Sequence, residues 1–143
     1  AFTVVGVSQA THIYSVAPNV ADNVTEIAVS GPGGNYFCPS ATIVGPKIDP
    51  GANFSNAYLN VTGYNGQSFD WAFTALGNTT YDMAVVIVKG GPTSAVYTYD
   101  YTATTAVDDA DNDLTAPTNP KNGKDYGISH IQFCFDPKGG GAN

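Results

Sequence analysis

Residues 84–101 read AVVIVKGGPTSAVYTYDY, and this stretch is the strongest indication of the fold class. Residues 84–88 are all apolar, so a strand formed there would be apolar on both faces, as in the centre of a sandwich. Gly90-Gly91-Pro92 is a turn signal. In the return run every other residue is a tyrosine: Tyr97, Tyr99 and Tyr101. Because successive strand residues point to opposite faces, the three rings would share one face. The stretch therefore predicts a β-hairpin within a packed sheet.

The rest of the chain has the composition of a β protein. It holds fourteen valines and fifteen threonines but only three leucines and one glutamate, and Val and Thr suit a pleated, half-buried surface. Alternation and turn residues predict about nine strands: Phe2–Val7, Thr11–Val16, Val24–Ser30, Ala41–Val44, Ala57–Thr62, Ser68–Phe73, Met83–Lys89, Ala95–Thr102 and Ile128–Phe135. We therefore expect a single domain over residues 1–143, an all-β antiparallel two-sheet β-sandwich of immunoglobulin-like or jelly-roll-like form. Residues 108–124 form the longest stretch without a predicted strand.

Two of these strands indicate which face is buried. In residues 68–73 the aromatic side chains share one side: Phe69, Trp71 and Phe73. In residues 128–135 the apolar side chains do the same: Ile131, Phe133 and Phe135. The two-residue period of a strand places these sets toward a common interior.

The charge balance excludes two classes of partner. Five lysines and no arginine stand against twelve acidic residues, which gives a net charge of −7. Nucleic acids and anionic membrane surfaces bind clustered positive charge, so we expect neither as a partner. No apolar run approaches the roughly 20 residues of a membrane span. The first residues, Ala-Phe-Thr, suit a processed secreted chain or a trimmed one, and we expect an extracellular or cell-surface location.

The two cysteines are Cys38 and Cys134, each beside aromatic residues. In a protein of this composition two cysteines favour a disulfide. The alternative is two free buried thiols in a cytosolic protein. No CxxC motif or neighbouring histidine supplies further ligands for a structural zinc site.

Residues 84–101, followed by TAPTNPKNGKDYGISHIQFCFD at residues 115–136, resemble a module of bacterial secreted and cell-surface proteins. Its signature is roughly vIVKGG, then YxY, aPxNxxNG and isHixFC. The resemblance covers about residues 84–136, and Asn35–Cys38 resembles the part of the module that holds its first cysteine. It implies an extracellular β domain of a secreted or wall-associated protein. It implies no catalytic residues, because the module has no established activity.

Residues 108–113 read DDADND and concentrate acidic side chains. Alternating carboxylates in a loop are able to bind Ca²⁺, with these ligands: Asp109, Asp111 and Asp113. The stretch is no EF-hand, because Leu114 stands where the loop requires Gly and Pro120 where it requires Glu. The alternative is a solvated acidic loop.

The tyrosines at 97, 99 and 101 have two interpretations. Exposed rings on one sheet face would stack against sugars, which would make the chain a carbohydrate-binding or adhesion module. Alternatively, the rings pack against a neighbouring strand.

No motif predicts catalysis. Ser129 and His130 are adjacent in a predicted strand and point to opposite faces, so they cannot act together as nucleophile and base. We expect no enzyme activity. Four N-x-[ST] sequons offer asparagines for glycosylation: Asn23, Asn53, Asn60 and Asn78.

The favoured function is assembly. A short β protein without catalytic motifs suits a subunit of an extracellular fibre or surface layer, with copies of itself or other surface components as partners. Residues 1–8 would donate a strand to the sheet of the next subunit, through these apolar side chains: Phe2, Val4, Val5 and Val7. Residues 138–143 would form a glycine-rich tail.

Overall fold

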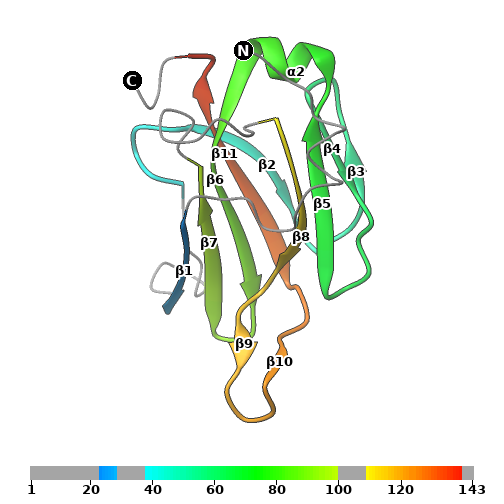
Figure 1. Cartoon of the computed structure of the whole chain (residues 1–143), viewed down its shortest axis with the longest axis vertical. Helices are drawn as coiled ribbons and strands as arrows, with labels where there is room; N and C mark the ends of the chain where they lie inside the picture. Colours follow the sequence, from blue (N-terminus) through cyan, green and yellow to red (C-terminus); the bar gives the residue numbers. More distant parts are fainter. Residues whose placement is uncertain (1–22, 29–37, 100–108, 140–143) are drawn as a thin grey trace.

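The computed structural model describes residues 23–28, 38–99 and 109–139, and within them the chain is an antiparallel two-sheet β-sandwich (Figure 1). The five-stranded sheet has the order β1-β7-β6-β11-β2. Its strands are β1 (Asn23–Ala28), β2 (Ile43–Ile48), β6 (Tyr81–Gly90), β7 (Thr93–Thr98) and β11 (His130–Pro137). The four-stranded sheet has the order β3-β4-β5-β8. Its strands are β3 (Phe54–Ser55), β4 (Leu59–Thr62), β5 (Ser68–Phe73) and β8 (Ala110–Thr115). The predicted fold class is confirmed.

Two small elements complete the described chain. A ribbon of β9 (Thr118–Asn119) and β10 (Lys124–Asp125) projects from one end of the sandwich (Figure 1). The helix α2 (Ala75–Thr80) joins β5 of one sheet to β6 of the other. No helix among the described residues is both long and apolar enough to cross a membrane.

The predicted hairpin is formed by β6 and β7, which pair from Val85↔Thr98 to Gly90↔Thr93. Gly91 adopts the left-handed conformation (φ 59°) in the turn, where a residue without a Cβ avoids strain. Strand β6 lies between β7 and β11. The prediction of a central strand, apolar on both faces, is therefore confirmed.

The main core lies between the two sheets. Phe69 of β5 meets Phe133 of β11 edge to face, with ring centroids 6.4 Å apart. The ring centroids of Phe73 and Phe135 lie 5.5 Å apart. Trp71, between Phe69 and Phe73 on the same face of β5, is fully buried. Both predicted apolar faces thus point to the same interior, and aromatic contacts of this kind stabilise beyond the area they bury.

The opposite face of the five-stranded sheet holds a second apolar cluster. Its buried members are Ala84, Val85, Ile87, Val96 and Cys134, with Cys38 packed against them. Cys38 and Cys134 form a disulfide, as predicted. The bond joins the segment before β2 to the middle of β11.

The structure differs from the predicted strands in several places. Strands β8, β9 and β10 occupy parts of the segment 108–124, for which no strand was expected, and neither strand β3 nor the short helix α2 was predicted. Strand β2 runs over Ile43–Ile48 rather than ending at Val44. The predicted strands at residues 2–7 and 11–16 lie outside the described residues.

Helix α2 has a local cause. Thr74 at its N-cap accepts a hydrogen bond from the Gly77 backbone N–H at 3.0 Å, which satisfies one of the N–H groups left unpaired at a helix start. Gly77 is buried against the backbone of Tyr58. A helix of six residues is too short to show a helical hydrophobic period in the sequence.

Candidate functional site

Strand β2 is an open edge of the five-stranded sheet. It pairs with β11 on one side, and the described residues provide no strand on its other side. An edge strand presents unpaired backbone N–H and C=O groups, which another strand is able to pair with. The edge of β2 therefore offers a surface for strand addition, as do the edges at β1, β3 and β8 among the described strands.

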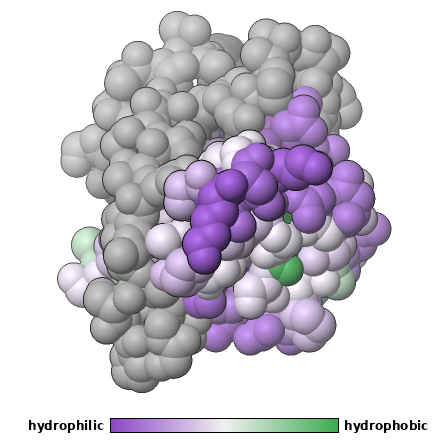
Figure 2. Space-filling view, turned by 90° about the horizontal axis from the view of Figure 1, so that it is seen from below, coloured by the Kyte–Doolittle hydropathy of each residue, from purple (hydrophilic) through white to green (hydrophobic). Residues whose placement is uncertain are grey.

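The first half of β2 is apolar and exposed. Ile43 is 39% exposed and Val44 is 70% exposed. Among the described residues only one other large apolar side chain is exposed, Leu76 on α2. Seen from the end of the molecule that carries β9 and β10, most of the coloured surface is hydrophilic (Figure 2). Ile43 and Val44 are thus two of the three large apolar side chains that the described residues expose.

The second half of β2 resists strand addition. Pro46 lacks an N–H, which confines proline to edge strands, and the pairing with β11 shifts register between Gln132 and Cys134. The Gln132 side-chain amide donates to the backbone oxygens of Gly45 at 3.0 Å and Pro46 at 3.3 Å. Bulges and prolines are devices that protect edges, so residues 43 and 44 are the accessible part.

Positive charge follows at the end of β2. Lys47 lies near His130, which is itself 5% exposed. Burial lowers the pKa of His130, and Lys47 and Lys89 lower it further, while Asp49 opposes them. These effects favour the neutral form of His130. It lies on a strand face with Gln132 and Cys134, as expected for a structural histidine.

The tyrosine platform predicted for sugars is not on the surface. Tyr97 is 2% exposed and Tyr99 is 7% exposed, and both belong to the core between the sheets. Sugar stacking requires an open ring face, so this prediction is wrong for these two residues. The packing alternative holds for them, and Tyr101 lies outside the described residues.

Instead of forming an exposed surface, the tyrosines take part in a buried network of hydrogen bonds. Trp71 donates from Nε1 to the Tyr99 hydroxyl at 3.2 Å, and this hydroxyl donates to Asp111 at 2.7 Å. Burial raises the pKa of Tyr99 well above 10, and the Asp111 carboxylate raises it further. The Tyr97 hydroxyl accepts from the Thr115 backbone N–H at 2.9 Å. Both tyrosines thus join β7, or the residue after it, to β8.

The aspartates predicted to bind calcium do not converge. Among the described residues, no group of three or more His, Cys, Asp and Glu side chains is placed to hold a metal ion. Asp111 is fully buried and engaged with Tyr99. Asp113 has a left-handed backbone (φ 57°), and its N–H donates to Asp70. The calcium prediction is wrong for Asp109, Asp111 and Asp113, because they lie at the start of β8 and in the strand itself instead of in a loop.

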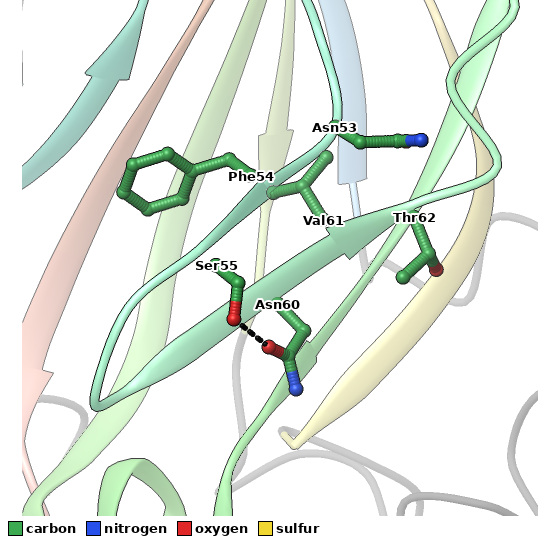
Figure 3. Close-up of a pocket in the computed structure, with 6 residues that line it drawn as sticks. All are labelled: Asn53, Phe54, Ser55, Asn60, Val61 and Thr62. Atoms are coloured by element: carbon green, nitrogen blue, oxygen red, sulfur yellow. Dashed lines mark hydrogen bonds between the residues drawn. The ribbon is translucent and has the colours of Figure 1, made fainter.

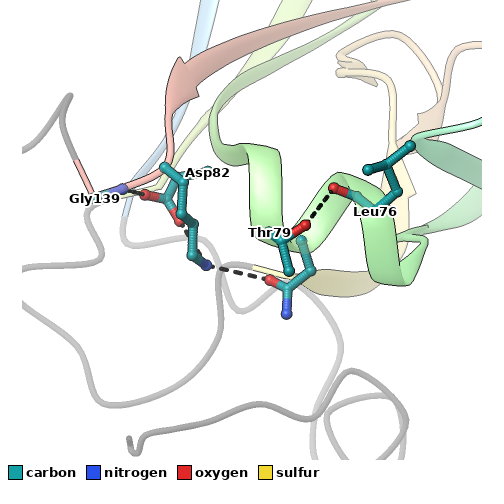
Figure 4. Close-up of polar contacts among 6 residues, drawn as sticks. Leu76, Thr79, Asp82 and Gly139 are labelled. Atoms are coloured by element: carbon teal, nitrogen blue, oxygen red, sulfur yellow. Dashed lines mark hydrogen bonds and ion pairs between the residues drawn. The ribbon is translucent and has the colours of Figure 1, made fainter.

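The remaining predicted residues are distributed over the molecule. The donor residues are outside the described part of the chain: Phe2, Val4, Val5 and Val7. Asn23 lies in β1 and Asn78 in α2, while Asn53 and Asn60 lie at the β3–β4 hairpin. Of the predicted tail, Lys138 and Gly139 are described. Both contact Asp82, by an ion pair at 3.2 Å and a backbone hydrogen bond at 2.6 Å respectively (Figure 4).

No residue pattern directly indicated that β2 would lie at an edge. Residues 43–44 belong to a predicted strand, but whether a strand is central or terminal depends on the order of pairing. Pro46 was the available signal, because a proline within a strand indicates an edge.

No family model, no curated protein and no solved structure matches the chain significantly. The resemblance of residues 84–136 to a bacterial surface module therefore stays a prediction.

Proposed function

We propose that this chain is a non-catalytic extracellular structural protein, a self-associating subunit of a surface fibre or layer. Its copies join when a strand from one subunit adds to the free edge of β2 in the next. The observation that carries this proposal is the exposure of Ile43 and Val44 on an edge strand without an outer neighbour among the described residues.

The chemistry of strand addition accounts for the features of this edge. Backbone hydrogen bonds to an edge strand provide affinity, and alternate side chains that dock on the sheet provide specificity. An incoming apolar strand would cover the exposed side chains of residues 43–44, whose burial is worth about 25 cal/mol per Å². Pro46 and the register shift in β11 would end the pairing there, which limits addition to one register.

Two further features support an extracellular scaffold. The disulfide suits an oxidising compartment, and the buried aromatic core spans both sheets. The segment proposed to donate is Phe2–Val7, which lies outside the described residues and has Phe and Val as its large side chains.

The first experiment compares two exposed apolar positions. Val44→Lys places a charge on the β2 edge, whereas Leu76→Lys places the same charge on α2, at a residue that is 52% exposed. We expect the unmodified protein and Leu76→Lys to form regular assemblies in negative-stain electron microscopy and sedimentation. We expect Val44→Lys to remain monomeric with unchanged thermal stability.

The second experiment addresses the donor. A chain without residues 1–8 should remain monomeric, although its β2 edge is intact. A synthetic peptide of residues 1–8 should bind this truncated chain and should not bind truncated Val44→Lys. Unmodified protein that is monomeric at all concentrations, or Val44→Lys that assembles normally, would refute the proposed function.

A further inference from the structure

The hairpin β3–β4 brings two of the four sequons together. An open depression on the four-stranded sheet is lined by Asn53, Phe54, Ser55, Asn60, Val61 and Thr62 (Figure 3). These six residues are the complete acceptor tripeptides Asn53-Phe54-Ser55 and Asn60-Val61-Thr62. Two sequons that are seven residues apart in the sequence therefore meet on one surface.

The strand register explains this meeting. Phe54 pairs with Val61, and Ser55 pairs with Asn60. Val61 is buried and Phe54 packs against the core, so the alternate residues lie on the outward face. Ser55 is exposed and Asn60 half-buried, and Asn53 and Thr62 beside them are exposed.

The amide groups are held by their oxygen atoms. Asn60 Oδ1 accepts from the Ser55 hydroxyl at 2.7 Å, and Asn53 Oδ1 accepts from the Tyr64 backbone N–H at 2.9 Å. Among the described residues, neither Nδ2 atom makes a hydrogen bond. The Nδ2 atom of Asn60 points away from Ser55 (Figure 3). The nitrogen that a glycosyl group would join is thus available at both positions.

The extended backbone at Asn53 and Asn60 also suits recognition of the N-x-[ST] motif. An enzyme that recognises N-x-[ST] must reach the amide and the hydroxyl two residues later. In an extended strand residues i and i+2 lie on the same face, whereas in a helix they do not face each other. Asn53 and Asn60 therefore present both groups together.

The sequon at Asn78 provides the contrast. Asn78-Thr79-Thr80 lies within α2. The Thr80 hydroxyl donates to the Leu76 backbone oxygen at 2.7 Å, and Asn78 Oδ1 accepts from Lys138 at 3.3 Å. Residues two apart in a helix do not face each other, so this tripeptide lacks the strand conformation of the other two sequons.

We infer that the outward face of β3–β4 is a modification site, N-glycosylated on Asn53 and Asn60. The donor is a lipid-linked oligosaccharyl diphosphate. Sugar C1 forms a bond to Asn Nδ2, while the bond from C1 to the diphosphate oxygen breaks and the lipid diphosphate leaves with that electron pair. The proton lost from Nδ2 passes to a base of the transferase.

The glycans would have a structural consequence for the four-stranded sheet. Strand β3 is a two-residue edge of the four-stranded sheet, and exposed edges pair with foreign strands unless they are covered. Carbohydrate beside β3 closes this edge. The edge of β2 lies in the other sheet and stays open.

The test is the intact mass of the protein isolated from its natural source, followed by peptide mapping with chymotrypsin. We expect two glycans, on Asn53 and Asn60, and an unmodified Asn78. A mass equal to that of the bare polypeptide would overturn the inference, as would glycans found only at Asn23 or Asn78.

Variants assign each position in a secretory host that performs N-glycosylation. Thr62→Ala removes the second sequon without changing Asn60, so the mass should fall by one glycan. Thr62→Ser keeps the sequon and should keep the glycan. Asn53→Gln should also lose one glycan, whereas Asn78→Gln should lose none. An unchanged mass in Thr62→Ala and Asn53→Gln would contradict the assignment.

Discussion

The two sheets of the sandwich differ in how many of their faces are buried. Strand β6 in the five-stranded sheet is buried at seven successive residues, 82–88. Strand β5 in the four-stranded sheet alternates between buried and partly exposed residues along its whole length. One sheet therefore carries apolar clusters on both sides, while the other is covered on one side only. The first sheet is the frame of the molecule, and the second presents a polar outer face to its surroundings.

The test with the largest expected effect removes the disulfide on the outer face of the five-stranded sheet. Cys38 and Cys134 are 96 residues apart, and a cross-link that closes a loop of this length stabilises by about 4–5 kcal/mol in the chain-entropy model. We expect the double variant Cys38→Ser and Cys134→Ser to lose about this much free energy of unfolding in urea titrations. A loss below about 1 kcal/mol would show that the bond adds little to the frame.

The next test compares the two outer faces directly. Ile87 is fully buried on the second face of the five-stranded sheet, so Ile87→Ala should cost about 2–5 kcal/mol through lost burial and a cavity. Ser68 lies on the outer face of β5 and is partly exposed, so Ser68→Ala should change stability by less than about 0.5 kcal/mol. Similar urea midpoints for the two variants would break the distinction between the sheets.

A smaller effect is expected where the chain crosses from one sheet to the other. Replacing Gly by Ala inside a helix normally stabilises by about 1 kcal/mol. At Gly77 in α2, however, an added Cβ would overlap the Tyr58 backbone oxygen and approach Phe73. Overpacking of this kind costs about 1–3 kcal/mol. Gly77→Ala should therefore lower the melting temperature, and a raised melting temperature would contradict the packing of α2.

The smallest effect concerns the contact between the sheets through Tyr99. Tyr99→Phe removes a donor from the buried Asp111 carboxylate and an acceptor from Trp71, at a cost of ~1–2 kcal/mol. The folded state raises the pKa of Tyr99, so it holds the phenolic proton to higher pH than the unfolded state does. The stabilising contribution is complete below about pH 10 and is lost as the pH rises further.

If Tyr99 only packed against its neighbours, replacing it by Phe would not change how stability depends on pH. The pH dependence therefore tests the role of the hydroxyl separately from packing. Free energies of unfolding between pH 9 and 11 should fall less steeply in Tyr99→Phe than in the unmodified protein. Tyr97 keeps its own raised pKa in both proteins, so a residual slope remains. Equal slopes would show that Tyr99 ionises in the folded state as readily as in the unfolded chain.

The core between the two sheets could be predicted from the sequence, because its signals are local. Residues 84–88 are apolar on both faces, and Phe69, Trp71 and Phe73 alternate with polar neighbours. Both patterns follow from the two-residue period of a strand. The cysteine pair was equally readable, since composition and number were sufficient.

The outer parts could not be predicted, because they depend on distant partners. Strand β8 contains Asp111, Asn112 and Asp113, which disfavour a strand. Asp111 is accommodated there by hydrogen bonds that include those from the Tyr99 hydroxyl and the Asn112 backbone N–H. The position of β2 at an edge depends on the order of the sheet. The meeting of the sequons at Asn53 and Asn60 depends on a register that involves two residue pairs.

The disulfide also limits how far the molecule is able to stretch. Covalent closure from Cys38 to Cys134 encloses every described strand from β2 to β10 and the first half of β11. A chain of 96 residues would extend to roughly 330 Å if pulled straight. With the bond intact, tension applied to the two ends of the chain cannot release this length, even if the enclosed strands separate. Held by its two ends, the chain would then behave as a short tether of fixed reach, and a reducing agent would convert it into an extensible one.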